Sequence, residues 1–304
     1  KALKNKTKNV IICLDNKWGG NFMSTTLVAL LESIIFIVIL VGGFFVGFWR
    51  GIKKSVANMI ISLIGAVVAF FVTPVVTRAI LSISITVDGT QTTIQNAIVT
   101  ALQNNQDIGQ MMQNNPNMEV FFKNLPLALG NVVVFIALTI AVECVVYLIY
   151  KIISIFLKTE KGAKKHRLAG GLVGLAKTFA ITVFAFMPFA CLVGVFDQMT
   201  TPEAYYSQTS QVSTTANEYG VIGEKLPKEV VISIKGLNEG MLSKICSFTS
   251  LDDSLFDYYS TFTIDGAKVT VRKELLSYYK AVDFAYQTTS LEKVNFQDIN
   301  FTLL

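Results

Sequence analysis

The sequence has very little histidine or cysteine. Its 304 residues contain one histidine, His166, which lies in the basic run KGAKKHRLAG, where we expect a solvated loop residue. Metal sites need several His or Cys ligands at close spacing. The four cysteines are far apart and none forms a CxxC pair, so the sequence predicts neither a metal site nor a disulfide framework. They are Cys13, Cys144, Cys191 and Cys246.

Recognisable catalytic motifs are also missing from the sequence. It has no HExxH motif, no GxxxxGK(S/T) phosphate loop and too little histidine for a Ser-His-Asp triad. The adjacent acids Asp252 and Asp253 lie in a loop-like stretch, where we expect a solvated turn rather than an acid/base pair. We therefore expect a protein that is not an enzyme and that needs no metal or cofactor.

Charged residues are scarce, while apolar residues are abundant. Only 15% of the chain is charged, 52% is apolar and the mean hydropathy is +0.52. Because soluble domains carry about a quarter charged residues, this composition predicts a membrane protein. Residues 196–304 hold 14 acids and nine Lys or Arg, whereas the rest of the chain holds seven acids and 17 Lys or Arg. We interpret the basic excess as membrane topology rather than as a nucleic-acid-binding surface.

Four apolar segments are long enough to cross the hydrocarbon core of a bilayer, which takes about 20 helical residues. They are residues 27–49, 56–77, 129–150 and 168–196. The expected fold is therefore an all-α polytopic membrane protein with four transmembrane helices in contact with the lipid bilayer.

The cations near these segments predict how the spans are oriented. The stretch GFFVGFWRGIKKSV and the loop at 151–167 are rich in Lys and Arg, and both lie on the same side of the membrane. The positive-inside rule places this side in the cytoplasm. The main determinants of this orientation are Arg50, Lys53, Lys54, Lys164, Lys165 and Arg167.

Residues 1–22 do not fit this orientation, because they carry five lysines on the side predicted to be outside. Met23 directly precedes the short polar lead into the first span. We therefore expect Met23 to be the natural initiator and residues 1–22 to be a non-native extension.

The segment at 82–126 is predicted to lie outside the membrane. Its apolar residues are spaced for an amphipathic helix over 93–112, lying against the spans or the membrane surface. We expect Pro116 and Pro126 to break this helical segment before the third span begins.

Residues 197–304 are predicted to form a small extracytoplasmic α+β domain. Asp265-Gly266 lies between two strand-like runs and favours a tight hairpin turn, since this dipeptide accepts positive φ angles. A helix over 273–286 follows, and its tyrosines are expected to pack in a core.

Two sequence motifs resemble those of a known family. The first is VGFWRGIKKSVANMIISLIGAVVAFFVTPVV at 46–76, a Gly-Phe-x-Arg-Gly type turn before a Lys-containing span rich in small residues. The second is HRLAGGLVGLAKTFAITVFAF at 166–186, with a basic residue, small residues and a lysine inside the span. Over residues 27–196 the chain is similar to the colicin V production protein family (CvpA). The resemblance implies a small bacterial inner-membrane protein with a role in peptide-toxin production or export, or more broadly in the envelope.

Small residues recur every four positions in the predicted spans. Such stripes let helix backbones approach closely, where van der Waals contact replaces the hydrophobic effect that lipid removes. They predict either packing inside the four-helix bundle or an interface with another membrane protein or a second copy. The residues are Gly43, Gly47, Gly51, Gly65, Ala69, Gly170 and Gly174.

Ionisable residues inside the predicted spans form a second candidate site. Glu143 and Lys177 lie ~12 Å and ~13 Å from the same membrane side, counted at 1.5 Å per residue. Charges at equal depth on consecutive antiparallel helices are expected to pair or to line a wet cavity. We predict a Glu143–Lys177 interaction, with unpaired snorkelling of Lys177 as the alternative. Glu32 is expected to be a lone acid in the outer part of the first span.

These observations predict a non-enzymatic membrane component that assembles with other membrane proteins or with itself. One alternative is a small transporter or channel component in which Glu143 and Lys177 line a path. Another is an envelope sensor whose domain at 197–304 binds a ligand.

Overall fold

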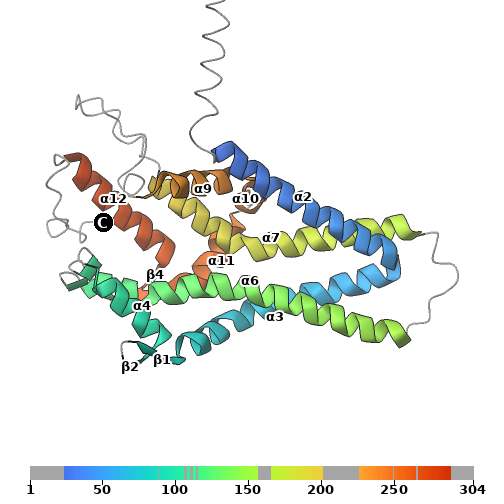
Figure 1. Ribbon diagram of the computed structural model, residues 1–304, viewed down its shortest axis with the longest axis horizontal. Coiled ribbons are helices and arrows are strands. Elements are labelled where there is room, and N and C mark those ends of the chain that lie inside the picture. The colour runs from blue at the N-terminus through green and yellow to red at the C-terminus, as the bar shows by residue number, and fades with distance from the viewer. Residues whose placement is uncertain are drawn as a thin grey trace, which may run out of the picture.

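A computed structural model describes residues 24–87, 89–105, 108–109, 112–113, 116–156, 166–200, 226–248, 250–264 and 266–288. The segment 1–22 and the cations Lys164 and Lys165, for which the sequence analysis makes predictions, lie outside these residues. Most of the described chain is helical (Figure 1). It contains four helices that are long and apolar enough to cross a membrane. These are α2 (Thr25–Arg50), α3 (Ile52–Leu81), α6 (Pro116–Phe156) and α7 (Arg167–Thr200).

Local sequence explains where these helices begin and end. The Ser24 side chain accepts a hydrogen bond from the Leu27 amide (3.2 Å) and caps the start of α2. Gly51, with φ of 75°, is the single residue between α2 and α3, so the predicted 50–55 turn shortens to one position. Lys53 and Lys54 therefore belong to the first turn of α3.

The prediction that two prolines break the helical segment before the third span agrees with the structure at Pro116, where a new helix begins, and is wrong for Pro126. Pro116 is the first residue of α6, a position where the missing amide hydrogen costs nothing. Pro126 lies inside the same helix, as Pro74 and Pro188 do in α3 and α7. Neighbouring helices compensate for prolines inside spans, so α6 starts 13 residues before the predicted 129.

The four long helices run alongside one another in two layers. α2 packs along α7, and α3 packs on both α6 and α7 (Figure 1). We call the end where α2 begins and α7 ends the outer end of the bundle, and the end where α2 meets α3 the inner end. Apolar side chains cover the outward faces of α2 and α3, such as Val38 and Val75, which are 63% and 68% exposed. These faces match the hydrocarbon of a membrane.

A small hairpin and one helix connect α3 to α6. β1 (Ser84–Val87) pairs antiparallel with β2 (Thr90–Thr93), with Ser84 opposite Thr93. α4 (Ile94–Gln103) follows and packs on α6, so the amphipathic helix exists but is shorter than the predicted 93–112. The Thr93 side chain caps it by accepting from the Asn96 amide (3.2 Å).

The described part of the region after α7 contains four helices and one hairpin. The helices are α9 (Lys228–Glu239), α10 (Met241–Ser247), α11 (Leu251–Ser260) and α12 (Val271–Thr288). β3 (Thr261–Ile264) and β4 (Ala267–Thr270) form the predicted hairpin, and Gly266 in its turn has φ of 80°. Asp265 lies outside the described residues.

α10 and α11, here called the wedge (residues 241–260), enter the outer half of the bundle. α11 lies between α7 and α6 (Figure 1). Phe256 on the wedge is fully buried with Phe121 and Cys191, and Tyr259 packs against Phe70 and Phe135 near the middle of the spans. The region after α7 therefore shares its hydrophobic core with the four long helices.

Hydrogen bonds fix the end of the wedge to the spans. The Asn131 side chain of α6 donates to the Tyr259 carbonyl (3.0 Å), and the Tyr259 hydroxyl donates to the Phe70 carbonyl of α3 (3.1 Å). Burial raises the pKa of Tyr259 above its ordinary value, so this hydroxyl remains a donor. Both bonds place α11 against the α3–α6 pair.

Candidate functional site: a polar cluster inside the bundle

Glu143 of α6 and Lys177 of α7 meet inside the bundle. Lys177 Nζ lies 2.7 Å from Glu143 Oε2, and the side chains are 14% (Lys177) and 29% (Glu143) exposed. A charge-assisted hydrogen bond of this length stabilises two groups that would each be costly in hydrocarbon. The arrangement is the paired one rather than the unpaired snorkelling of Lys177.

Arg50 and Asn58 complete a polar cluster with this ion pair. Asn58 of α3 is 5% exposed, and its side-chain amide lies between the two cations. With the amide oxygen oriented toward them, it accepts from Lys177 Nζ (2.9 Å) and Arg50 Nη1 (3.1 Å). The Arg50 guanidinium also lies 5.5 Å from the ring centroid of Tyr147, a cation–π distance.

Helix direction explains why these side chains converge although their backbones lie at different depths. Cα–Cβ bonds in a helix tilt toward its N-terminus. Arg50 in the last turn of α2 therefore points into the bundle, whereas Lys177 of the antiparallel α7 points back toward the inner end. Asn58 is one and a half turns into α3 and meets both.

The cluster lines a cavity of about 320 Å³. Glu143 Oε1 is buried there and has no hydrogen-bond partner among the described residues. A second cavity of about 920 Å³, mostly apolar, shares Glu143 and Tyr147 with the first and extends toward the outer end between α2 and α6. The cluster therefore combines a satisfied ion pair with one free acceptor.

The predicted glycines hold the helices around this cluster. Gly43 and Gly47 of α2 face Gly174 and Gly170 of α7, and a Cβ at Gly47 would lie 2.8 Å from Gly174 Cα. Gly65 faces Val142 of α6 in the same way, and Ala69 is buried beside Phe135. These small residues meet within the chain, and Gly51 serves the turn between α2 and α3. Ser55 adds a hydrogen bond to the Gly47 carbonyl (3.1 Å).

Glu32 is not the lone acid that the sequence suggested. It is 9% exposed, and its Oε1 accepts from the Ser243 amide at the start of the wedge (3.2 Å). Ser33 accepts from the Met241 amide (3.1 Å) and donates to Glu32 Oε2 (3.3 Å). Gly240 leaves room for the carboxylate, because a Cβ there would lie 2.5 Å from Glu32 Cδ. Glu32 therefore attaches α10 to α2. The two segments are about 200 residues apart in the sequence, so the sequence alone could not predict this contact.

The described topology determinants gather at the inner end. Arg50, Lys53 and Lys54 lie around the α2–α3 junction, and Arg167 is the first residue of α7. Arg50 is also a member of the polar cluster, a role that the sequence analysis did not predict.

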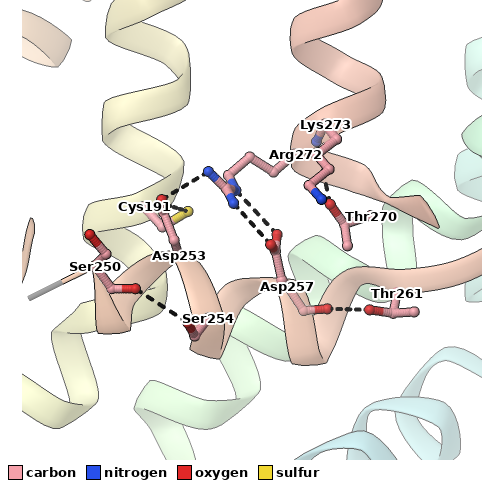
Figure 2. Close-up of polar contacts among 9 residues, drawn as sticks. All are labelled: Cys191, Ser250, Asp253, Ser254, Asp257, Thr261, Thr270, Arg272 and Lys273. Carbon is pink, nitrogen blue, oxygen red and sulfur yellow. Dashed lines mark hydrogen bonds and ion pairs between the residues drawn. The ribbon is translucent and has the colours of Figure 1, made fainter. Parts of the chain in front are cut away.

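A second polar group connects the wedge to α12. Arg272 donates from Nη1 to Asp253 Oδ2 (2.9 Å) and from Nη2 to Asp257 Oδ2 (2.9 Å), as Figure 2 shows. The hydrogen bonds to Asp257 raise the pKa of Arg272, with burial opposing them, so the guanidinium stays charged. Cys191 of α7 donates to Asp253 Oδ1 (3.4 Å). We call Arg272, Asp253 and Asp257 the arginine latch.

The adjacent acids Asp252 and Asp253, predicted to form a solvated turn, lie in the first turn of α11. Asp252 is 5% exposed, and burial raises its pKa above the ordinary value. Asp253 belongs to the arginine latch, so the two neighbours have different environments. The sequence analysis missed Asn58 and Arg272, although an acid at 253 and another at 257 on one helix face could have indicated a cationic partner.

The fold and the buried charges define an integral membrane protein with four candidate membrane-spanning helices and an ion pair between two of them. Residues 33–220 match the family model of the Colicin V production protein, which covers more than half of the chain. The chain therefore belongs to the colicin V production protein family. Neither the curated proteins nor the solved structures gave a match.

Proposed function

We propose that this chain is a bacterial inner-membrane protein that supports peptide-toxin production or export, or envelope homeostasis, by assembling with other membrane proteins or with itself. The observation that carries the proposal is the family match over residues 33–220. The family is not known as enzymatic, which supports a role in assembly rather than catalysis.

We infer that such an assembly would use surfaces that the chain itself leaves uncovered. The glycines of α2 and α7 contact each other, so they are covered by the chain itself. The outward faces of α2 and α3 remain apolar and exposed, with Ile64 and Phe71 60% and 61% exposed. A partner helix in the membrane would pack there, with the inner end in the cytoplasm and the region after α7 on the extracytoplasmic side.

A second candidate function is a small transporter or channel component. The observation that favours it is Glu143 Oε1, a buried acceptor without a partner among the described residues that faces a cavity of about 320 Å³. Intramembrane acids that line cavities commonly mark ion or substrate paths.

Charge exchange at the ion pair separates the two functions. The chain would be deleted from a toxin-secreting strain and restored as wild type, as Glu143→Gln, or as Glu143→Lys with Lys177→Glu, and secreted toxin and copurifying membrane proteins would be measured. An assembly role predicts that the exchanged pair restores both. A transport role predicts that Glu143→Gln alone abolishes secretion while the bundle still folds.

The matched control is Glu119→Gln, because Glu119 forms an exposed i,i+4 pair with Lys123 (2.7 Å) outside the cluster. It should behave as wild type in both measurements. Unchanged toxin secretion and an intact envelope after complete deletion would contradict the proposed function.

A further inference from the structure

Pro74 deprives one backbone carbonyl of α3 of its usual hydrogen bond. α3 is helical from Ile52 to Leu81 and continues through Pro74. In an α-helix the amide of residue i donates to the carbonyl of residue i−4, and proline has no amide hydrogen. The carbonyl that loses its donor is therefore that of Phe70. A carbonyl left without a donor inside a span costs free energy, so another donor is needed.

A tyrosine of the wedge supplies this donor. The Tyr259 hydroxyl donates to the Phe70 carbonyl (3.1 Å), and Tyr259 is only 4% exposed. The rings of Tyr259 and Phe70 also lie together, with their centroids 5.0 Å apart. The Asn131 side chain of α6 donates to the Tyr259 carbonyl (3.0 Å) and so fixes the tyrosine backbone. The hydrogen bonding of α3 is thus completed by a residue 189 positions away from the acceptor.

Two threonines weaken the regular hydrogen bonding of α3 at the same place. Thr73 donates from its hydroxyl to the Ala69 carbonyl (2.7 Å), and Thr77 donates to the Thr73 carbonyl (2.9 Å). Side-chain bonds of this i to i−4 type often accompany helix bends. Together with Pro74, they give this part of α3 the composition of a helix hinge.

We propose that α3 has a hinge at Pro74 and that the wedge holds this hinge in one position. Displacement of the wedge removes the Tyr259 donor, so the straight helix loses stability and the outer segment of α3 (75–81) is free to bend. Phe71 and Val75 lie on either side of the hinge and are 61% and 68% exposed. Bending therefore changes the outward face of α3, which connects the region after α7 to a surface of the spans.

A double-mutant cycle tests whether Pro74 and Tyr259 are coupled. Tyr259→Phe removes only the hydroxyl, and Pro74→Ala restores an amide that can donate to the Phe70 carbonyl within α3. Thermal unfolding of the full-length protein in detergent is measured for the wild type, both single variants and the double variant. We expect Tyr259→Phe to lower the Tm by about 3–6 °C when Pro74 is present, and by less than half as much in Pro74→Ala.

Two control variants match these changes. Tyr258→Phe removes a hydroxyl from the neighbouring tyrosine, which is 53% exposed, and should leave the Tm unchanged with or without Pro74. Pro126→Ala restores an amide in α6, whose acceptor would be the Phe122 carbonyl, and should not reduce the effect of Tyr259→Phe. Equal losses from Tyr259→Phe in the Pro74 protein and in Pro74→Ala would overturn the proposal.

Spin-label distances test the movement itself. In a background without native cysteines, labels are attached at Leu27→Cys, near the start of α2, and at Ile83→Cys, just beyond α3; both positions are exposed. Double electron–electron resonance is then recorded in lipid bilayers. We expect Tyr259→Ala, which removes the ring and the hydroxyl, to broaden the distance distribution, and Pro74→Ala added to it to narrow the distribution again.

A second pair of labels reports from the inner half of the bundle. Ile60→Cys on α3 and Leu172→Cys on α7 are exposed and lie on the inner side of the hinge, so their distance should be the same in all variants. If Tyr259→Ala does not fold, Tyr259→Phe replaces it and a smaller broadening is expected. An unchanged outer distance in the folded variant, or a broadening that Pro74→Ala does not reverse, would overturn the proposal.

Discussion

At the scale of single residues, polar groups in this protein are placed where the four spans need a partner. Glu143 and Lys177 neutralise each other, Asn58 connects Lys177 to Arg50, and Glu32 binds backbone amides of the wedge. Each group would cost several kcal/mol if it were left without a partner in an apolar environment. Their positions therefore restrict how the helices can be arranged.

Cys246 gives a prediction about pH at this scale. It is fully buried in the wedge, and burial, followed by the nearby Asp252 and Glu32 carboxylates, raises its pKa from 9.0 to about 12. Between these values the unfolded chain loses the thiol proton and the folded chain keeps it. The free energy of unfolding should therefore fall by up to about 1.4 kcal/mol per pH unit as the pH rises above 9.

Unfolding in detergent at pH 8 and pH 10.5 would measure this loss. Cys246→Ala should lose less stability over that interval than the wild type. Cys144→Ala changes an exposed thiol and should behave as the wild type. If Cys246→Ala loses as much stability as the wild type, the Cys246 thiol is not the cause of the fall in the free energy of unfolding above pH 9.

At the scale of elements, the α2–α7 contact depends on two glycines from each helix. A Cβ at Gly47 would overlap the Gly170 carbonyl oxygen and the backbone of Gly174, whereas a Cβ at Gly42 would meet nothing within 4 Å. Gly47→Ala should therefore separate the helices and destabilise the bundle by about 1–3 kcal/mol, as overpacking of a close contact does. Gly42→Ala is the matched control and should be neutral or slightly stabilising.

Thermal unfolding of both glycine variants in detergent measures the difference. Crosslinking between single cysteines on α2 and α7 would report the separation directly. A Gly47→Ala protein as stable as Gly42→Ala would mean that the two helices do not pack as closely as described.

The arginine latch fixes α12 to the wedge, and its geometry requires a guanidinium. Arg272 reaches Asp253 and Asp257 with separate nitrogens, which a single ammonium cannot reproduce. Arg272→Lys should therefore expose α12 to proteolysis nearly as much as Arg272→Ala. Limited proteolysis of the protein in detergent, with Lys268→Ala as the control on β4, checks this expectation. Wild-type resistance of Arg272→Lys would show that charge alone is sufficient.

At the scale of the whole molecule, the region after α7 is continuous with the membrane bundle. Phe256, Val271 and Tyr279 are buried in the same cluster as Phe121 and Val195 of the spans. A sensor that binds ligand through residues 197–304 alone would need this region to fold without the spans. The shared core argues against such independence.

The orientation of the whole molecule is open to a direct measurement. In a background without native cysteines, Lys53→Cys lies at the inner end and Gln103→Cys at the end of α4, both exposed. We expect an impermeant thiol reagent to label intact cells at Gln103→Cys and not at Lys53→Cys, because the positive-inside rule places the inner end in the cytoplasm. The opposite pattern would invert the protein and place the region after α7 in the cytosol.

The sequence predicted the four long helices well because each is a long apolar run, and the polar residues within them stand out. The equal depths of Glu143 and Lys177 followed from counting residues on antiparallel helices. The wedge could not be predicted in this way, since its contacts with Phe70 and Phe135 join segments more than a hundred residues apart. Its mixed composition resembles that of a soluble domain, although Phe256 and Tyr259 are buried against the spans.

The position of the wedge in the chain also affects how the protein is made. The ribosome completes all four spans before it reaches residues 241–260, so the bundle first enters the membrane with its outer half unfilled. Until the wedge arrives, Phe135, Asn131 and Glu32 lack the groups that cover them in the finished protein. Biogenesis therefore includes a late closing step, and a chaperone or partner protein present during synthesis would find this opening accessible for a limited time.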